Sequence, residues 1–521
     1  MSLREVVEQY ASRHPDDVLE INEAVSTEYE ITAIANEVEN RAPLLIFSNV
    51  LGYPGFRVVS NVFSSKKRIA AYFGLKDEGE FYSFWRRIMK VEKEPEIRER
   101  ASSEVETMKG KNVDLNVLPV PKHYPQDGGR YITSGLIVSR KPDDPRVINL
   151  SFARIQVISR NEVALSLHSR GHLWSYFEMS KERKTDLPIS VIIGAHPIYY
   201  LLAAARIENE YLRVGGVVND HLVKGLTNDI PVPASSEIVL EGKIKWNEFY
   251  KEGPFTEYTG YISNRSTNNY AIIDAMMIKK NPIYLEINPS NSKEHIILSS
   301  IAKEPLILET VSSFYQTSSS YALEWPLKGV HYVLFGKIPK PQKGEAMQLA
   351  LLLLGLDHYL KIVIISENET SLKFFDLISG ILCDYRYAVL DEVLCNRLDP
   401  SASPEGTSSK LILLVKPQRD LKIINFNDDV YLERCGKKLH IGRQIDENAE
   451  ANIVVGNDID PRDEDQVLWA LATRFQPRND LKVVNGKIVI YAKKEGLNAP
   501  KLPDEAIKKA KQILLLAKVP S

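Results

Sequence analysis

Between about Asn112 and Pro289 the sequence consists of short apolar segments separated by turn residues. Tyr131 to Arg140 and Val147 to Ser159, for example, flank the turn Lys141 to Pro145. Two strand-like runs joined by a few Gly, Pro, Asn or Asp residues are typical of a β-hairpin. A succession of such hairpins predicts a mainly antiparallel sheet or barrel in the middle of the chain.

The regions on either side of this sheet follow another pattern. From about residue 3 to 105, helical stretches mix with short apolar runs, which indicates a small α/β domain. After about residue 306, residues 331–336, 345–356 and 361–365 read as strand, helix and strand, the order of a parallel α/β layer. A chain of 521 residues is long enough for two or three domains.

Two further helices are predicted near the C-terminal end. The acidic segment Asp460 to Asp465 predicts the start of a helix from Gln466 to Arg474, because negative charge favours a helix N-terminus. Pro503 to Ala517 reads as an amphipathic helix, with apolar residues at helical spacing, namely Ile507, Ala510, Ile513 and Leu514. This apolar face needs a partner, either in its own chain or in a neighbouring subunit.

Charge and cysteine content exclude several classes of protein. Lys and Arg total 66 and Asp and Glu total 68, a formal charge of -2. Nucleic-acid binding needs concentrated positive charge, so we expect no nucleic-acid partner. The three cysteines contain no Cys-x-x-Cys pair, which argues against a disulfide scaffold or a cysteine zinc site and favours a reducing cytoplasm; they are Cys383, Cys395 and Cys435.

Neither a secretion signal nor a membrane span is predicted. Met1 to Tyr10 lacks a basic segment followed by an apolar stretch. The longest apolar run, Leu349 to Leu356, is too short to cross a bilayer. We therefore expect a cytoplasmic protein.

The segment Val147 to Ser159 contains the first candidate site. Its apolar residues change from even to odd positions along the strand, at Leu150, Phe152, Ile155 and Val157. A regular strand cannot change phase, so a bulge or bend is predicted near Ala153. That defect would put four polar residues on one face, namely Asn149, Ser151, Arg154 and Gln156. This face either meets water or belongs to a functional site.

Glu252 and Glu257 form the second candidate site. Neither an ideal strand nor an ideal helix puts residues five apart on one face. Gly253 and Pro254 break the regular geometry, however, and can return both carboxylates to a common site, where one could be charged and the other protonated. The alternative is an ordinary surface loop.

His168 and His172 are four residues apart, as two metal ligands on one helical face would be. The zinc-protease pattern needs a glutamate directly after its first histidine, and Ser169 follows His168 here. From the spacing alone, a satisfied or exposed histidine pair is the simpler explanation. A helix is predicted from Ile198 to Ile207, after a proline suited to its first turn, with Glu208 at or just beyond its end.

Four motifs coincide in order and spacing with one known family: Asn149 to Arg154, Val232 to Gly242, Glu252 to Tyr261, and Val454 to Pro477 around Asp458 and Asp460. Over most of its length the chain resembles the UbiD-like family of prenylated-FMN-dependent decarboxylases. The resemblance implies an α/β (α+β) fold in three parts. These are an N-terminal α/β domain (1–110), a central split β-barrel that binds flavin (111–305), and a C-terminal α/β domain with a terminal helix that supports oligomerisation (306–521).

The resemblance also implies site residues. By motif position, the catalytic arginine and two glutamates of the family fall on Arg154, Glu252 and Glu257. A divalent metal that holds the flavin phosphate, commonly Mn2+ or else Mg2+, would be bound by Asn149, His172 and Glu208, with K+ nearby. Contacts with prenylated FMN are implied for Asn149, Ser151, Phe152, Ala153, Arg154, Gly171, His172 and Glu208.

The implied activity is reversible, non-oxidative decarboxylation of an aromatic or α,β-unsaturated carboxylic acid, with the prenylated flavin as electron sink. Arg154 would orient the substrate carboxylate, Glu252 would hold the guanidinium, and Glu257 would deliver the replacing proton. The implied partners are a small-molecule acid, a flavin prenyltransferase that supplies the cofactor, and further copies of the chain in a homodimer or homohexamer. Pro503 to Ala517 is the predicted contact between subunits.

Two other interpretations stay open. The substrate could be a phosphorylated isoprenoid acid of an archaeal mevalonate-type pathway. The chain could also be a non-catalytic subunit that binds prenylated flavin, although a binding module has no need of a proton donor beside the cofactor.

Overall fold

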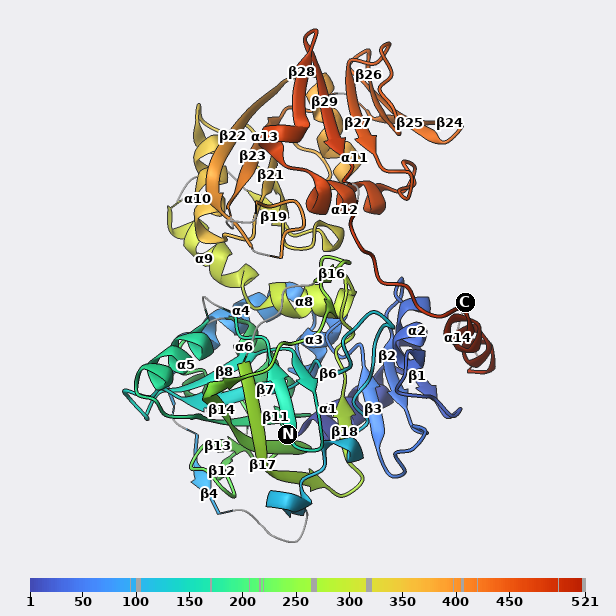
Figure 1. Cartoon of the computed structure of the whole chain (residues 1–521). Helices are drawn as coiled ribbons and strands as arrows, with labels where there is room; N and C mark the ends of the chain where they lie inside the picture. Colours follow the sequence, from blue (N-terminus) through green and yellow to red (C-terminus); the bar gives the residue numbers. More distant parts are fainter. Residues whose placement is uncertain are drawn as a thin grey trace. The chain divides into compact units, whose positions relative to one another are not determined.

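The computed structural model describes the chain except residues 94, 100–104, 169–170, 206, 215–216, 219, 264–268, 315–320, 397, 404–406, 419, 495 and 518–521. The described residues form two compact units, residues 1–306 with 499–521, and residues 307–498 (Figure 1). The predicted mixture of helices with antiparallel and parallel strands is confirmed. The finer division into domains 1–110, 111–305 and 306–521 stays a prediction.

The first unit begins with a four-stranded sheet, four α-helices and one 3-10 helix, η1. These elements are α1 (Leu3–Arg13), η1 (Pro15–Asp17), β1 (Val18–Ile21), α2 (Glu30–Glu37), β2 (Leu44–Phe47), β3 (Arg57–Ser60), α3 (Lys66–Tyr72), α4 (Glu78–Ile88) and β18 (Ile283–Leu285). The strand order is β1-β2-β3-β18, and only the β2–β3 pair is antiparallel among these described strands. A capping box at Ser2 and Glu5 starts α1. Strand β18 comes late in the sequence, directly after the last strand of a larger sheet. The chain therefore connects the N-terminal sheet to that larger sheet through β18.

A larger sheet forms the centre of the first unit. Its strands are β5 (Val105–Lys109), β6 (Arg130–Ile132), β7 (Leu136–Arg140), β8 (Ile148–Phe152), β9 (Ile155–Val157), β10 (Glu162–Leu165), β11 (Leu187–Ile193), β14 (Ile238–Phe249) and β17 (Asn269–Lys279). The order is β6-β9-β10-β17-β14-β11-β7-β8, with β5 beside β17. Each of these pairings is antiparallel, as predicted from the hairpin pattern.

The predicted strand Val147 to Ser159 is in fact two strands, β8 and β9. They stand near opposite ends of the strand order, yet only Ala153 and Arg154 separate them. Three residue steps span at most roughly 11 Å. The two ends of the sheet must therefore approach each other, which curls the sheet into a half-barrel. The break predicted near Ala153 from the change of phase is confirmed.

Smaller elements complete this unit. They are β4 (Ile97–Arg98), η2 (Gly110–Asn112), η3 (Leu115–Val117), α5 (His172–Glu182), α6 (Pro197–Ala205), α7 (Tyr211–Val214), β12 (Leu222–Lys224), β13 (Pro231–Pro233), β15 (Phe255–Thr256), β16 (Ile262–Ser263), α8 (Lys293–Ile301) and α9 (Glu304–Phe314), which crosses into the second unit. The helix predicted from Ile198 is α6, with Pro197 in its first turn.

The C-terminal helix α14 (Asp504–Leu516) belongs to the first unit, where it lies beside α2 (Figure 1). Its buried residues are Ala506, Ala510 and Ile513. Lys509 Nζ donates to Glu30 Oε2 at 2.7 Å. One face of the helix thus packs on its own chain, while Leu515 and Leu516 are exposed. A contact between subunits through this helix stays a prediction.

The second unit contains two sheets. The first has the order β19-β20-β21-β23-β22 and the second β24-β25-β26-β27-β29-β28. The elements are β19 (Ala322–Glu324), η4 (Leu327–Gly329), β20 (Val333–Lys337), α10 (Glu345–Leu356), β21 (Ile362–Ser366), α11 (Phe374–Ile378), η5 (Ser379–Leu382), β22 (Tyr385–Leu394), β23 (Thr407–Val415), β24 (Lys422–Phe426), β25 (Asp429–Arg434), β26 (Lys437–Gly442), β27 (Ala451–Val455), α12 (Glu464–Arg474), α13 (Pro477–Asp480), β28 (Leu481–Val484) and β29 (Lys487–Ala492). Strands β20 and β21 are parallel and α10 connects them, which confirms the predicted α/β layer.

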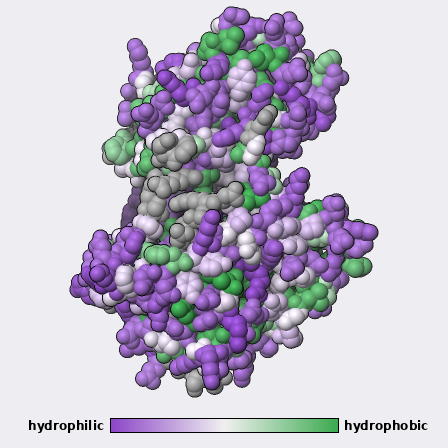
Figure 2. Space-filling model, viewed as in Figure 1, coloured by the Kyte–Doolittle hydropathy of each residue, from purple (hydrophilic) through white to green (hydrophobic). Residues whose placement is uncertain are grey.

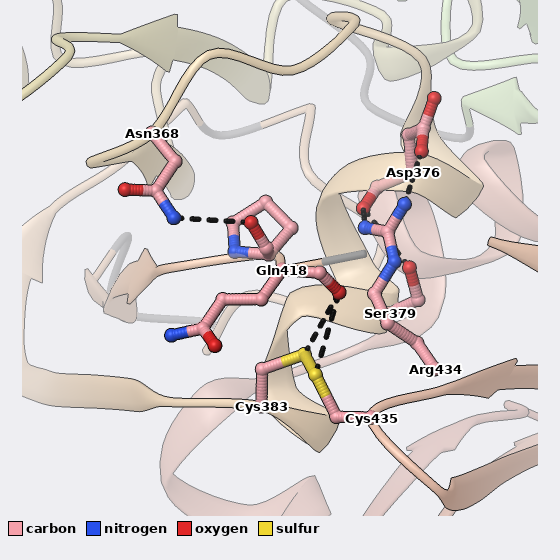
Figure 3. Close-up of a disulfide and its surroundings, with 8 residues drawn as sticks. Asn368, Asp376, Ser379, Cys383, Gln418, Arg434 and Cys435 are labelled. Atoms are coloured by element: carbon pink, nitrogen blue, oxygen red, sulfur yellow. Dashed lines mark hydrogen bonds and ion pairs between the residues drawn. A yellow bond between two sulfur atoms is a disulfide. The ribbon is translucent and has the colours of Figure 1, made fainter. Parts of the chain in front are cut away.

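A disulfide joins Cys383, which follows η5, to Cys435 in the turn between β25 and β26 (Figure 3). The expectation that the cysteines form no disulfide is therefore wrong for this pair. The two residues are 52 positions apart, and no short motif marks this pair, because only the packing of η5 against β25 and β26 brings the two cysteines together. Cys395 is a buried free thiol.

Polar side chains predominate on the face of the molecule seen in Figure 2, with scattered apolar residues among them. None of the helices in the described part of the chain has the length and apolar content that crossing a bilayer requires.

Candidate active site

Arg154 lies at the point where the chain crosses from β8 to β9. Its side chain is 11% exposed. The crossing is forced by the position of β8 and β9 in the half-barrel, so the guanidinium stands where the two ends of the sheet approach each other.

The loop that carries Glu252 and Glu257 reaches Arg154 from about a hundred residues further along the chain. We call residues 250–257 the acid loop. Arg154 Nε donates to Glu252 Oε1 at 2.6 Å, and Nη2 donates to Glu252 Oε2 at 3.0 Å. Arg154 Nη1 donates to Glu257 Oε1. The sequence-based expectation that Gly253 and Pro254 return both carboxylates to one place agrees with this geometry.

All three charged groups are largely removed from water. The Glu252 side chain is fully buried and that of Glu257 is 9% exposed. Burial by itself lowers the pKa of Arg154, but the charges of Glu257 and Glu252 outweigh it and raise this pKa, so the guanidinium remains a cation. The Phe255 ring lies 5.4 Å from the guanidinium carbon and adds a cation–π contact.

A second polar cluster surrounds Asn149 on β8. Its Nδ2 donates to Glu210 Oε1 at 2.8 Å and lies 3.4 Å from His172 Nδ1. Ser151 Oγ donates to Asn149 Oδ1 at 2.6 Å, and Leu150 N donates to Glu210 Oε2 at 3.0 Å. An amide, an imidazole and a carboxylate thus meet at one end of the half-barrel.

Glu208, the carboxylate expected in this cluster, lies elsewhere in the same loop. Its side chain is 54% exposed, with Oε1 3.8 Å from Lys141 Nζ. Glu210 is buried instead, and burial raises its pKa to about 8 against the opposing effect of its hydrogen bonds. The sequence did not point to Glu210, because Glu208 and Glu210 are the same residue type two positions apart. No local pattern tells which of them turns inward. The left-handed backbone of Asn209 between them, at φ 57°, is a property of the folded loop.

The other expected cofactor residues lie around this cluster. Gly171 is the N-cap of α5 and His172 its first residue, so the cluster faces the positive end of an 11-residue helix. Phe152 packs near the buried Tyr200, with ring centroids 6.1 Å apart, and Ala153 is buried. His168 accepts a backbone hydrogen bond at its carbonyl oxygen from Gly171 N at 2.8 Å.

The donor set around Asn149 fits a hard divalent cation. Within the described residues, no group of three or more His, Cys, Asp or Glu side chains could hold a metal. Asn149, His172 and Glu210 supply only two residues of those types. The Asn149 amide faces the other two groups with Nδ2 while Oδ1 accepts from Ser151, so the amide would have to turn to present its oxygen to a metal. Oxygen and imidazole donors of this kind suit Mn2+ or Mg2+ better than a structural zinc ion.

Family comparison agrees with this fold. Models of the 3-octaprenyl-4-hydroxybenzoate carboxy-lyase family match residues 11–88 (N-terminal domain), 95–292 (Rift-related domain) and 442–496 (C-terminal domain). Together they cover more than half of the chain, and they define a carboxy-lyase. The chain belongs to the UbiD family.

Curated relatives are decarboxylases of different substrates. Anhydromevalonate phosphate decarboxylase of Archaeoglobus fulgidus is 29% identical over 369 residues, which are 69% of this chain and 83% of the relative. Phenolic acid decarboxylase of Sedimentibacter hydroxybenzoicus is 27% identical over 429 residues, 76% of this chain and 88% of the relative. The chain is accordingly a decarboxylase of the UbiD class.

Solved structures share the same fold. The UbiD-class enzyme HmfF from Pelotomaculum thermopropionicum, in complex with FMN, has a TM-score of 0.72 and 25% identity, covering 82% of this chain and 98% of HmfF. The 3,4-dihydroxybenzoic acid decarboxylase of Klebsiella pneumoniae has a TM-score of 0.72 and 20% identity, covering 79% of this chain and 93% of that enzyme. A structural relative thus binds FMN.

Proposed function

We propose that this protein decarboxylates an aromatic or α,β-unsaturated carboxylic acid, reversibly and without net oxidation, with prenylated FMN as cofactor. The observation that carries the proposal is the Arg154 guanidinium between the buried carboxylates of Glu252 and Glu257. A guanidinium can bind a substrate carboxylate through two hydrogen bonds, and a carboxyl group beside it can deliver a proton.

The two glutamates take different roles in this proposal. Glu252 contacts Nε and Nη2 and so fixes the plane of the guanidinium from one edge. Glu257 contacts Nη1, which a substrate carboxylate can take over. Once separated from the guanidinium, the Glu257 carboxyl group can hold a proton and transfer it to the carbon that loses CO2. The reaction balances, because one proton replaces one carboxylate that leaves as CO2.

Prenylated FMN, when bound, would supply the electron sink for the cleaved carbon–carbon bond. Asn149, His172 and a carboxylate would hold Mn2+ or Mg2+ for its phosphate, and the N-terminus of α5 would favour the same negative charge. The hydrogen bond between Asn149 and Glu210 supports Glu210 as this carboxylate in preference to Glu208. The remaining cofactor contacts proposed are Ser151, Phe152, Ala153, Arg154 and Gly171, with K+ nearby.

The metal assignment can be tested without any substrate. Glu210→Gln should lose most of the bound Mn2+ measured by elemental analysis, whereas Glu208→Gln, a matched change two residues away, should retain it. The reverse result would restore Glu208 as the ligand.

The partners follow from this chemistry. We propose a flavin prenyltransferase as the source of the cofactor and assembly into a homodimer or homohexamer. A cytoplasmic location is also proposed, and the Cys383–Cys435 disulfide is the observation that opposes it, since disulfides are rare in a reducing cytoplasm. The exposed Leu515 and Leu516 beside the packed face of α14 support a contact between subunits there. A monomer in light scattering would overturn the assembly part of the proposal.

The substrate is the open part of the function. Similarity to phenolic acid decarboxylase supports an aromatic acid. Similarity to anhydromevalonate phosphate decarboxylases from Archaeoglobus fulgidus and Methanosarcina mazei, at 29% and 26% identity, supports the alternative, a phosphorylated isoprenoid acid.

A substrate panel decides between these candidates. Protein co-expressed with a flavin prenyltransferase is incubated with 4-hydroxybenzoates, unsaturated acids and anhydromevalonate phosphate, and CO2 release is followed by mass spectrometry. CO2 from one group identifies the substrate class. Bound prenylated flavin without CO2 from any acid would instead support the non-catalytic subunit.

A further inference from the structure

Gln156 is the polar residue of β9 that the roles above leave unused. It lies two residues after Arg154, so both side chains belong to the same alternating set along the chain. Gln156 is 6% exposed. Gly253 N, in the acid loop, donates to Gln156 Oε1 at 2.8 Å, and Gln156 Nε2 donates to Gly128 O at 2.9 Å. One buried carboxamide thereby joins the strand after Arg154 to the loop that carries its two partners.

The backbone contact beside this carboxamide allows little movement. Gly128 N donates to Pro254 O at 2.7 Å. A Cβ on Gly128 would stand 2.6 Å from Gly253 Cα, closer than any side chain tolerates. Both glycines are therefore required for the close approach of the two backbones.

Further contacts hold the same loop from the segment 124–131, which we call the clasp. Asp127 Oδ1 accepts hydrogen bonds from Thr256 N at 2.9 Å and Thr256 Oγ1 at 3.0 Å. The Tyr131 hydroxyl donates toward the carbonyl oxygens of Gly253 at 3.1 Å and Pro254 at 3.2 Å. The clasp is itself paired with β9, because β6 places Arg130 opposite Val157 and Tyr131 opposite Gln156. Gln156 adds a direct side-chain link from β9 to the acid loop, through its hydrogen bond with Gly253 N.

We propose that Gln156 is a positioning residue that sets the acid loop against Arg154, and so fixes where Glu252 and Glu257 stand relative to the substrate carboxylate. The inference rests on the proposed decarboxylase function for its kinetic consequence. The mechanical part rests on the contacts of Gln156 alone. Gln156 acts through Gly253, the neighbour of Glu252.

The mechanical part is tested by hydrogen–deuterium exchange on the full-length protein without substrate. Gln156→Leu removes the acceptor of the Gly253 amide, so exchange in the peptide covering residues 250–257 should become about tenfold faster or more. Gln476→Leu is the matched control, because Gln476 is also a buried bridging carboxamide, bound to Ser401 and Ser409 in the second unit. The control should leave exchange in the acid loop unchanged.

The kinetic part uses the same two variants with the cognate acid. A loop displaced by about 1 Å costs up to roughly 100-fold in rate, so Gln156→Leu should lower kcat by about 10- to 100-fold. KM should change by less than about threefold, the pattern of an interaction expressed mainly in the transition state. The visible spectrum of bound flavin should stay as in the wild type, and Gln476→Leu should keep the wild-type kcat.

Gly128→Ala tests the same contact from the other side of the bridge, since its methyl group forces the two backbones apart. It should reproduce the fall in kcat, whereas Gly355→Ala, which meets open space, should not. Unchanged exchange of the acid loop in Gln156→Leu, or faster exchange with unchanged kcat, would overturn the proposal. A wild type that exchanges as described but decarboxylates no acid would count against the proposed function and leave the Gln156 bridge standing.

Discussion

Each unit contains a buried cation beside carboxylates, but the number of carboxylates per cation differs. In the first unit, Glu252 and Glu257 share the guanidinium of Arg154. In the second, Lys361 Nζ lies 3.1 Å from Asp399, and both side chains are 2% exposed. Asp399 Oδ1 also accepts hydrogen bonds from Ser401 N at 2.9 Å and Ser401 Oγ at 2.6 Å.

The difference concerns what each cluster can still do. In the second unit, one lysine faces one aspartate, and Ser401 donates two hydrogen bonds to that aspartate. Such a pair contributes to the fold, because separating its members would leave a buried charge without a partner. In the first unit two acids share one guanidinium, so a substrate carboxylate can replace Glu257 there while Glu252 stays bound. The displaced Glu257 can then take up a proton. Removing a member should therefore stop turnover in the first unit and lower stability in the second.

The largest effect is expected for Glu257→Gln. The amide keeps the shape of the side chain but has no acidic proton, so decarboxylation should fall by about 100- to 10,000-fold. CO2 release from the cognate acid measures this, with the melting temperature as the control for folding. Turnover at the wild-type rate would remove Glu257 from the mechanism and erase the contrast between the clusters.

Asp399→Asn should act on stability instead. It leaves the charge of Lys361 buried without a carboxylate, which costs about 3–5 kcal/mol of unfolding free energy. Denaturant unfolding of the full chain measures the loss, and kcat at a temperature where the protein is folded should not change. The double variant with Lys361→Met should recover part of the loss, because the uncompensated charge is gone. No recovery would show that the two residues are not coupled.

Removal of the Cys383–Cys435 disulfide, which lies in the second unit, should also change stability rather than turnover (Figure 3). A bridge across 52 positions restricts the unfolded chain and contributes about 4 kcal/mol in the chain-entropy account. The double serine variant should melt earlier than the wild type and match the wild type in reducing buffer. Cys395→Ala is the matched control, since it removes a cysteine without a bridge. A wild type whose melting ignores reductant would contradict a stabilising bridge.

The smallest effect concerns Lys410, a buried lysine of the second unit. Burial lowers its pKa from 10.5 to about 8, with Asp357 opposing the shift. Between these two values the unfolded chain binds more protons than the folded one, so this group makes stability rise with pH from about 8 to 10.5. Lys410→Met should flatten that rise in melting temperature measured across pH 7.5 to 10. An unchanged slope would assign the rise to other groups.

Much of the fold could be predicted because its signals are local. Hairpin spacing indicated the antiparallel sheet, and the change of phase around Ala153 indicated the break between β8 and β9. The predicted strand Tyr131 to Arg140 is divided in the structure, with Gly135 packed against Val191 and Ile155. That division depends on neighbours from distant strands, which the pattern within one strand does not contain.

The site around Arg154 depends on both the local sequence and the tertiary structure. The sequence by itself determined that a polar residue follows a strand defect and that Gly253 and Pro254 break the acid loop, because periodicity and backbone restrictions act between adjacent residues. Only the tertiary structure decided that Glu210 rather than Glu208 contacts Asn149, that Cys383 meets Cys435, and that Gln156 bridges to Gly253. These contacts join residues 52 to 97 positions apart, and folding, not local pattern, selects which of several like side chains meet.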